Sequence, residues 1–443
     1  GLKGLVRAEE DLAARLLGLA RRPGFDSESV DLLLAADEGA RSLSDEQRAA
    51  VRAAACAGCF VLTGGPGVGK TTTTRVLARC LVGLGASVAL AAPTGKAAKR
   101  MSEVVGLPAR TLHRLLGSSA KGFQHGPSDP LPYDVVIVDE TSMLDTTLAR
   151  ALVRAIGPRG RLILVGDDDQ LPSVGPGQVL RDLLAADRVP AALLTTVFRQ
   201  AARSRIVTNA HRIREGLLPE FDSPSSLAHG ADCVFVTAAP AQVARVGAQW
   251  AAELLPRALG VSPDEVQALA PLTRVCQALN STLQARLNPA GGQPETAHGA
   301  LPLRVGDRVI QTRNNYDLGV FNGDSGILAR ISGDTLSVDF GDGRLVEYAP
   351  IDAIDLDHAY CLTVHRAQGS EWPGVVLLAS SSFGPMLSRS LLYTALTRAR
   401  RAVVVVGDKE AVARAVRETR DQHRQTGLPT LLAASALSGA GIG

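Results

Sequence analysis

The sequence predicts an α/β protein with more than one mostly parallel β-sheet. Short apolar runs alternate with stretches of helical periodicity, and continuous apolar runs of this length are typical of strands that crossover helices bury on both faces. The runs fall into two groups separated by the long stretch 200–260, which indicates two sheets. The predicted strands are Cys59–Thr63, Val88–Ala92, Val135–Asp139, Leu162–Gly166, Val266–Ala270, Val375–Ala379 and Val403–Gly407.

Other segments depart from this alternation. Residues 5–40 predict short amphipathic helices, at Asp11–Leu17 and Val30–Leu34. Residues 106–132, rich in Gly, Pro and Ser, predict a small insertion or an extended loop between strands. Residues 303–350 contain short strands joined by Gly-Asp and Asn-Gly turns, which indicates a small antiparallel barrel inserted in the second α/β region. We expect the tail at 427–443, low in charge and rich in small residues, to be partly disordered.

Composition narrows the class of protein. The chain of 443 residues, 46% apolar and 21% charged, has ordinary globular usage and excludes wholesale disorder or a fibre. A net charge of +3 does not by itself indicate a nucleic-acid or membrane partner, so any polyanion site must be local. Because no run of about 18 apolar residues occurs, we expect neither a membrane span nor a signal peptide. A chain that begins Gly1-Leu2-Lys3 is also consistent with a fragment.

The six cysteines are scattered along the chain, and only Cys56 and Cys59 have a spacing found in metal sites. No second close pair or neighbouring His completes such a site, and Cys59 opens an apolar strand. We therefore expect buried thiols and not zinc. Scattered thiols fit a reducing compartment, and we expect the protein in the cytoplasm.

A glycine-rich motif follows the first predicted strand. Residues Gly64–Thr71 satisfy the pattern G-x-x-x-x-G-K-[ST] and precede a helical run at Thr72–Leu84. In this context backbone N–H groups curl around phosphate oxygens, Lys70 reaches the β and γ phosphates, and Thr71 takes Mg²⁺. A glycine-rich turn without a ligand is the competing interpretation, which the strand-to-helix context disfavours. The expected binding residues are Gly65, Pro66, Gly67, Val68, Gly69, Lys70, Thr71 and Thr72.

The strand at 135–139 ends in paired carboxylates, Asp139 and Glu140. Beside a phosphate loop, Asp139 can hold the Mg²⁺ shell and Glu140 can polarise the attacking water. Acidic residues also end buried strands by chance, and the upstream phosphate loop is what favours a site. The two motifs together predict an NTPase.

Further polar residues indicate how hydrolysis by the predicted NTPase could be coupled to work. Gln170 follows the strand at 162–166 and is placed to touch the γ phosphate and sense its loss. Arg199 and Arg398 lie near element boundaries, and an arginine from a second domain would make hydrolysis depend on closure of a cleft. Most arginines of the chain are expected to be solvated, so neither one alone indicates a site.

These motifs occur in the order and spacing of superfamily 1 helicases, which the chain resembles over about residues 41–408. The shared motifs are Gly64–Thr72, Ala92–Ala98, Asp139-Glu140, Gly166–Pro172, Thr363–Glu371 and Tyr393–Arg400. Residues in Leu279–Pro289 and Val305–Asp324, among them Asn280, Gln284, Asn288 and Asp307, are similar to the RecD-like branch in particular.

The resemblance implies two RecA-like domains with ATP between them, single-stranded DNA across the top and movement from 5′ to 3′. It implies that Gln47 contacts adenine, that Arg199 and Arg398 are the γ-phosphate arginines, and that Gly369 and Glu371 lie near the ribose and phosphates. Ser44–Gln47 also forms a capping box that would open a helix, and the two roles of Gln47 are compatible.

The resemblance also implies a domain organisation. It consists of a helical N-terminal segment (1–40), a first RecA-like domain (41–105 and 133–198), a small pin-like insertion (106–132), a second RecA-like domain (199–302 and 357–425), an SH3-like barrel (303–356) and a flexible tail (426–443).

Candidate contacts to DNA are Thr94, Lys96, His113, Thr363, His365 and Arg366. Lys96 follows an apolar strand, where loops face the ligand side of a sheet, although Lys96, Lys99 and Arg100 also fit a solvated helix face. Aromatic residues make up only 4% of the chain, which excludes a long stacking ladder. Contacts from backbone and hydroxyl groups to phosphates should therefore dominate.

We predict an ATP-dependent DNA helicase similar to stand-alone RecD-like enzymes, acting as a monomer on single-stranded DNA and on junctions with duplex, with a role in repair or recombination. One alternative is an RNA-directed motor, because backbone contacts need not exclude a 2′-hydroxyl. Another is a nucleotide-dependent switch that moves nothing. The arginine motifs and the segment Thr363–Glu371 disfavour the switch.

Overall fold

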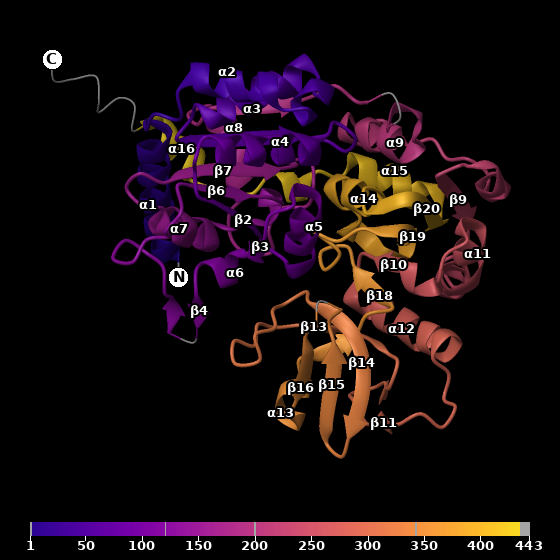
Figure 1. Ribbon diagram of the computed structural model, residues 1–443. Coiled ribbons are helices and arrows are strands. Elements are labelled where there is room, and N and C mark those ends of the chain that lie inside the picture. Colours follow the sequence, from indigo (N-terminus) through magenta and orange to yellow (C-terminus); the bar gives the residue numbers. More distant parts are fainter. Residues whose placement is uncertain (1, 120, 199–200, 342, 435–443) are drawn as a thin grey trace. The chain divides into compact units, whose positions relative to one another are not determined.

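The computed structural model describes residues 2–119, 121–198, 201–341 and 343–434 (Figure 1). They form two compact units, the first comprising Gly1–Ala201 with Asp421–Gly443 and the second Ala202–Arg420. The chain therefore leaves the first unit once and returns to it. Each unit holds a parallel sheet, and the second also holds a small antiparallel sheet, so the predicted α/β fold class is confirmed.

The first unit is built on a six-stranded parallel sheet with the order β3-β2-β6-β7-β1-β8. Its strands are β1 (Cys59–Gly64), β2 (Val88–Ala92), β3 (Ala109–Thr111), β6 (Val135–Val138), β7 (Arg161–Gly166) and β8 (Ala191–Leu194). Its helices are α1 (Leu2–Ala20), α2 (Ser27–Ala36), α3 (Asp45–Ala55), α4 (Lys70–Gly83), α5 (Gly95–Val105), α6 (Leu112–Leu115), α7 (Thr146–Ala155), α8 (Val179–Ala186) and α16 (Leu428–Ala434).

Helices cover both faces of this sheet, as the continuous apolar strands require. In β1, Cys59 and Val61 point into a core shared with α1, α7, α8 and α16, whereas Phe60 and Leu62 point into a core shared with α2, α3 and α4. Burial raises the pKa of the Cys59 thiol to about 12, as expected for a buried thiol, whereas Cys56 is partly exposed.

Helix α1 belongs to the first unit through its packing on α7 (Figure 1). Asp11 of α1 accepts hydrogen bonds from Arg150 (2.7 Å) and Arg154 (2.9 Å) of α7. Burial opposes ionisation of Asp11, but the hydrogen bonds from Arg150, Arg15 and Arg154 outweigh it and lower its pKa. The helical N-terminal segment is confirmed. No helix within the described ranges combines the length and the apolar character needed to cross a bilayer.

Two parts of the first unit differ from the sequence prediction. The insertion predicted over 106–132 is narrower, because β3 pairs with β2 and Leu112, Leu115, Leu116 and Leu131 are buried in the core. Within the predicted insertion, β4 (Ser118–Ser119) and β5 (Gly122–Phe123) form a short hairpin outside the main sheet.

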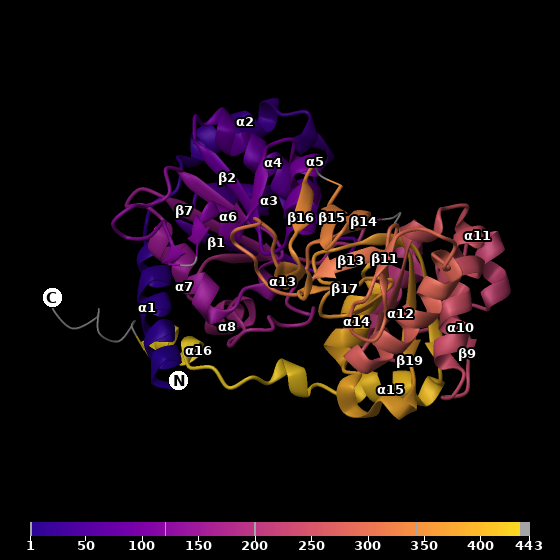
Figure 2. The same cartoon turned by 90° about the horizontal axis from the view of Figure 1, so that it is seen from below.

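The flexible tail predicted from residue 426 is wrong for Leu428–Ala434, which form α16. Figure 2 shows this helix beside α1, and Leu428 and Leu432 are buried in the core. Residues 435–443 lie outside the described residues.

The second unit holds a five-stranded parallel sheet with the order β18-β10-β19-β20-β9. Its strands are β9 (Cys233–Thr237), β10 (Val266–Ala270), β18 (Cys361–Thr363), β19 (Trp372–Ala379) and β20 (Ala399–Gly407). Its helices are α9 (Arg205–Arg214), α10 (Val243–Gln249), α11 (Leu255–Leu259), α12 (Thr273–Leu287), α14 (Arg389–Leu396) and α15 (Lys409–Arg417), and a π-helical turn at Trp250–Leu254 joins α10 to α11.

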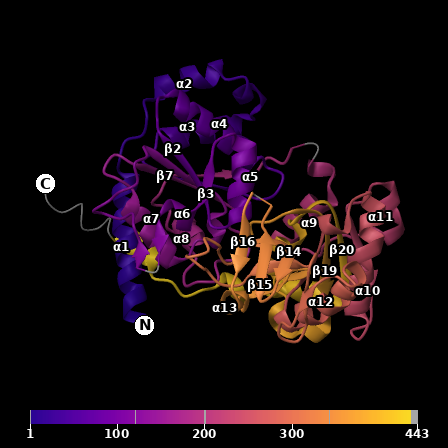
Figure 3. The same cartoon turned by 60° about the horizontal axis from the view of Figure 1, so that its bottom comes forward.

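Between α12 and β18 the chain forms the predicted antiparallel barrel. Figure 3 shows strands of its sheet side by side. Its sheet has the order β16-β15-β14-β13-β17. The strands are β13 (Arg308–Gln311), β14 (Ser325–Ser332), β15 (Thr335–Asp339), β16 (Leu345–Tyr348) and β17 (Leu356–His358), with helix α13 (Pro350–Ala353) and a hairpin of β11 (Glu295–Thr296) and β12 (Leu303–Arg304) beside them. Its own small core includes Leu303, Val309, Leu328, Val338 and Tyr348.

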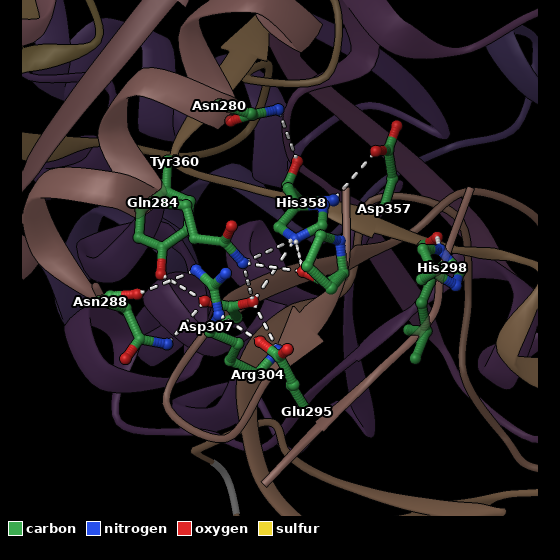
Figure 4. Close-up of polar contacts among 12 residues, drawn as sticks. Asn280, Gln284, Asn288, Glu295, His298, Arg304, Asp307, Asp357, His358 and Tyr360 are labelled. Carbon is green, nitrogen blue, oxygen red and sulfur yellow. Dashed lines mark hydrogen bonds and ion pairs between the residues drawn. The ribbon is translucent and has the colours of Figure 1, made fainter. Parts of the chain in front are cut away.

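A buried polar cluster around Asp307, the Asp307 network, ties the barrel to α12 and β18 (Figure 4). The Asp307 carboxylate, with no exposed surface, accepts hydrogen bonds from Gln284 (2.6 Å), Asn288 (2.7 Å), Tyr360 (2.8 Å) and the Arg304 backbone N–H (2.8 Å). His358 Nε2 lies 3.4 Å from the same carboxylate. Of the RecD-like residues in Leu279–Pro289, Gln284 of α12 and Asn288 at its C-cap thus serve to bind Asp307.

Candidate nucleotide and nucleic-acid sites

The phosphate-loop motif forms the turn between β1 and α4, as predicted. Gly67 and Gly69 have φ values of 76° and 81°, left-handed conformations that favour glycine. A Cβ on Gly69 would lie 2.4 Å from Gln47 Nε2, so a side chain does not fit there. The loop therefore presents backbone N–H groups ahead of a 14-residue helix, an arrangement that suits a phosphate chain.

Lys70 lies folded over this loop. Its Nζ donates hydrogen bonds to the carbonyl oxygens of Gly64 and Gly65, the latter at 2.9 Å. It also lies 4.0 Å from Asp167 Oδ2. Phosphate oxygens would be stronger acceptors than these carbonyls, because the acceptor would then carry a charge opposite to that of the Lys70 ammonium.

Asp139 and Glu140 follow β6, in the same sheet as the phosphate loop. Because β6 pairs with β7 and β7 pairs with β1, the carboxyl ends of the three parallel strands share one edge. Glu140 has φ 54° and ψ 41°, and its N–H donates to Asp139 Oδ1 at 2.8 Å. A left-handed glutamate is strained by about 1–2 kcal/mol, and such residues concentrate at functional sites.

Gln170 follows β7 at this edge and is 6% exposed. Its Nε2 lies 3.4 Å from Asp167 Oδ2, whereas its buried Oε1 has no hydrogen-bond partner in the part of the chain that the structure describes. A buried acceptor without a donor costs about 1–3 kcal/mol, which ligand or water can offset. The geometry of loop, carboxylates and amide fits a nucleoside triphosphate.

Gln47 takes part in the capping box that the sequence predicts at the start of α3. Its N–H donates to Ser44 Oγ at 3.3 Å, and its Oε1 accepts from the Ser44 N–H at 3.1 Å. Its Nε2 donates to Val68 O in the phosphate loop at 2.9 Å. The side chain is 1% exposed, so only the second N–H of the amide remains for a base, and the adenine contact stays a prediction.

Sequence reasoning gave no role to two residues of this region. Asp167 lies beside Lys70, and its carboxylate lies within 4.8 Å of those of Asp168 and Asp169. Phe198 is 38% exposed, its N–H donates to Gly67 O at 3.3 Å, and its ring borders Gly69. For Phe198, the sequence signal was its position directly before Arg199, a predicted phosphate-binding arginine. Arg199 itself lies outside the described residues.

The candidates of the second unit gather near the start of β19. Arg398 is only 2% exposed, and it donates to Thr394 O (3.2 Å) and Ser370 O (3.2 Å). Gly369 has φ 71°, and Glu371 forms an ion pair with Arg400 at 3.1 Å. Arg398 thus lies next to the segment Gly369–Glu371, and the phosphate and ribose roles of these residues stay predictions.

The candidate DNA contacts lie at the carboxyl ends of edge and interior strands. Thr94 caps α5 by accepting from Ala97 N at 3.3 Å, and Lys96 lies in the first turn of that helix. His113 of α6 lies with its ring 5.9 Å from that of Phe123 in the hairpin, and burial lowers its pKa, which favours the neutral ring.

In the second unit, Thr363 Oγ accepts from Arg366 N at 3.3 Å, and Arg366 pairs with Asp357 at 3.2 Å. His365 is half-buried in the same turn. The structure thus brings Thr363, His365 and Arg366 together, and Thr94 with Lys96.

Comparisons with known proteins agree with this arrangement. Family models match residues 42–227 (AAA domain), residues 279–340 (ATP-dependent RecD-like DNA helicase SH3 domain) and residues 358–406 (UvrD-like helicase C-terminal domain). The RecBCD enzyme subunit RecD of Mycolicibacterium smegmatis is 36% identical over 87% of this chain and 74% of that subunit. The chain belongs to the RecD-like helicase family.

A second relative and a solved structure are also similar to this RecD-like chain. The ATP-dependent RecD2 DNA helicase of Deinococcus radiodurans is 41% identical over 93% of the chain, and the chain spans only 55% of that helicase's length. A structure of Pif1 helicases on forked duplex DNA matches with a TM-score of 0.50 and 18% identity, over 90% of this chain and 98% of that one. This likeness shows the fold alone, that of two RecA-like domains.

Proposed function

We propose that this RecD-like chain is an ATP-driven motor that moves along single-stranded DNA from 5′ to 3′ and separates the duplex ahead of it. The observation that carries the proposal is the shared edge of β1, β7 and β6, which collects the phosphate loop, Gln170 and Glu140 in one place. The named relatives are ATP-dependent DNA helicases or subunits of a DNA-processing enzyme, which supports DNA as the track.

The hydrolytic chemistry follows from the side chains. The backbone N–H groups of Gly65 and Gly67–Gly69 bind phosphate oxygens, and Lys70 exchanges its two carbonyl acceptors for the β and γ phosphates. Thr71 and Asp139 would hold Mg²⁺, which supplies charge neutralisation on the phosphates. Glu140 accepts the proton of the attacking water, and Gln170 contacts the γ phosphate.

Arg398 and Arg199 complete the charge neutralisation, which makes hydrolysis depend on the second domain. Each cycle of ATP binding and release would then ratchet the two domains along the strand. Thr94, Lys96, His113, Thr363, His365 and Arg366 hold the DNA backbone, so binding should tolerate any sequence and weaken as salt rises. A single cytoplasmic chain suffices for this cycle.

The test is strand displacement with ATP and Mg²⁺ on a duplex that carries either a 5′ or a 3′ single-stranded tail. Lys70→Ala is the inactive variant and Lys3→Ala, a Lys on the exposed face of α1, the matched control. We expect unwinding from the 5′ tail by wild type and by Lys3→Ala, and none by Lys70→Ala.

Each other outcome has a distinct meaning. Unwinding from the 3′ tail alone keeps the motor and refutes its direction. Faster ATP hydrolysis with single-stranded RNA than with matched DNA favours an RNA motor, and hydrolysis indifferent to both favours a switch. ATP hydrolysis retained in Lys70→Ala contradicts the assignment of the site.

A further inference from the structure

The C-terminal segment 421–434, the strap, returns from the second unit and docks on the first. Its helix α16 packs on α1 and α8, with Leu428 and Leu432 buried in the core of the first unit. Ahead of α16, Gly427 N donates to Glu9 Oε2 at 3.0 Å, and Thr426 Oγ donates to Asp182 Oδ1 at 2.9 Å. The strap is therefore anchored firmly from residue 426 onward.

One strap residue reaches beyond this anchor. Arg424 Nη1 donates hydrogen bonds to the carbonyl oxygens of Gly175 (2.8 Å) and Gly177 (3.0 Å). These two glycines lie in the loop 173–178, which follows directly on the segment that carries Gln170. Burial, aided by the nearby Arg181, lowers the pKa of Arg424, but an arginine stays charged at neutral pH, so both bonds are charge-assisted.

The loop 173–178 is held tightly on its other side. Thr146 N donates to Pro176 O at 2.9 Å. A Cβ on Gly175 would lie 2.3 Å from Asp145 Oδ2, and one on Gly177 would lie 2.1 Å from Thr146 Oγ. The loop therefore lies between Arg424 and the start of α7, and only glycine at positions 175 and 177 allows so close an approach.

An open cavity lies between the strap and the first unit and meets the loop at Gln178. This cavity of about 560 Å³ is lined by Gln422, Arg424 and Thr426 of the strap and by Asp168, Arg181 and Asp182 of the first unit, among others. In its wall Arg181 Nη1, Gln178 Oε1 and Asp182 Oδ2 have no hydrogen-bond partner among the residues described. The carbonyl oxygens of Gly175 and Gly177 also accept hydrogen bonds from Ser173 Oγ (3.1 and 3.3 Å), but Ser173 belongs to the loop itself, so the Arg424 bonds are what join these carbonyls to the strap.

We propose that Arg424 is a positioning residue that sets the place of Gln170 through the loop 173–178 and links that place to the second unit. Only three residues separate Arg424 from Arg420, where the second unit ends, so a shift of that end reaches the loop through the chain itself. This inference rests on the proposed ATP-driven motor and adds a route by which the sensor of the γ phosphate is coupled to domain movement.

The test compares Arg424→Ala with Arg420→Ala, which removes a neighbouring arginine that is 84% exposed and pairs only locally with Glu418. ATP hydrolysis is measured with and without an oligo-dT strand, and kcat and KM are separated. We expect Arg424→Ala to lower the DNA-stimulated kcat about tenfold with KM for ATP within about twofold, since a misplaced group costs turnover and not binding. Arg420→Ala should match wild type.

Two further variants separate positioning from stability. Arg424→Lys can still donate to both carbonyls and should recover most of the lost kcat. Thr426→Val removes the bond to Asp182 and should lower the melting temperature while it leaves kcat unchanged. Wild-type turnover in Arg424→Ala, or an equal loss of kcat in Thr426→Val, would overturn the inference. If wild type itself shows no DNA-stimulated hydrolysis, the proposed function fails, and the two failures are thereby distinct.

Discussion

The phosphate loop and the Asp307 network are both polar and both formed by residues that the sequence marks as motifs, yet their hydrogen bonding differs. Around Asp307 the carboxylate accepts four hydrogen bonds of 2.6–2.8 Å. In the phosphate loop Lys70 binds carbonyls of its own loop, and after the neighbouring strands Glu140 has a left-handed backbone and Gln170 Oε1 has no partner among the described residues.

The difference distinguishes residues that stabilise the fold from residues that bind a ligand or take part in a reaction. A satisfied buried network adds rigidity and specifies one packing, whereas unmet hydrogen bonds and strained backbone stay in a fold only where a ligand or a reaction needs them. We therefore expect substitutions at Asp307 to change stability and substitutions at the phosphate loop to change turnover.

The largest effect should come from Glu140→Gln, which keeps the shape of the side chain and removes its ability to accept a proton. General-base catalysis contributes about 10²–10⁴-fold, so kcat for ATP should fall by about that factor. Thermal unfolding should match wild type. Glu28→Gln, on the exposed face of α2, is the matched control, and a kcat within tenfold of wild type would contradict the role of Glu140.

Asp307→Asn should act on stability instead. The amide would place an –NH₂ group against buried donors, which leaves some of them unpaired, and we expect a loss of about 3–4 kcal/mol in the free energy of unfolding. Urea titration measures it, with Asp317→Asn, an exposed barrel aspartate, as the control. A loss below about 1 kcal/mol would show that the network does not carry the attachment of the barrel.

Acid should weaken the same network. Burial opposes ionisation of Asp307, but hydrogen bonds from His358, Arg304 N, Asn288 and Tyr360 outweigh it and lower its pKa. A lowered folded-state pKa gives stability that is complete above the unfolded value of about 3.9 and is lost as pH falls through the folded-state pKa. The unfolding free energy of Asp307→Asn should therefore depend less on pH below about pH 4 than that of wild type, and equal slopes would count against the ionised carboxylate.

Tyr360→Phe removes a single bond of the network, the 2.8 Å contact with Asp307, and keeps the ring. A hydrogen bond to a charged group contributes about 1.5–3 kcal/mol, so we expect a loss of about 2 kcal/mol. The exposed Tyr316 gives the comparison variant Tyr316→Phe, which should be neutral. Equal melting temperatures for the two variants would be inconsistent with the network.

The smallest effect concerns the strain at Glu140. Glu140→Gly relieves a φ of 54° and should raise the free energy of unfolding by about 0.5–1 kcal/mol, net of the greater freedom of glycine in the unfolded chain. The same variant should be inactive. A variant that is both less stable and inactive would show that the left-handed backbone stores no strain.

The sequence predicts the interior of the fold better than its edges. All seven predicted strands are present, and each lies inside its sheet. The four parallel strands that were missed, β3, β8, β9 and β18, are the outermost strands of the two sheets. An edge strand has one neighbour and is covered less, so its apolar run is short or interrupted, as in the exposed Ala191 and Leu193 of β8.

Sites formed by residues close together in the sequence were also easier to predict than sites formed by distant residues. Local motifs predicted the phosphate loop, the carboxylates after β6 and the capping box at Gln47, because neighbours in sequence form them. The Asp307 network was visible only as a resemblance of Gln284, Asn288 and Asp307 to the RecD-like branch, since its donors and its acceptor lie on different elements. The contact of Arg424 with Gly175 joins residues 249 apart, and no local pattern encodes it.

The most direct measurement is DNA-stimulated ATP hydrolysis by wild type, Glu140→Gln and Asp307→Asn, at a temperature where circular dichroism shows all three folded. We predict stimulation by single-stranded DNA in wild type and Asp307→Asn, and almost no hydrolysis in Glu140→Gln despite its full stability. Hydrolysis by Glu140→Gln at the wild-type rate, or no stimulation of wild type by DNA, would contradict the account.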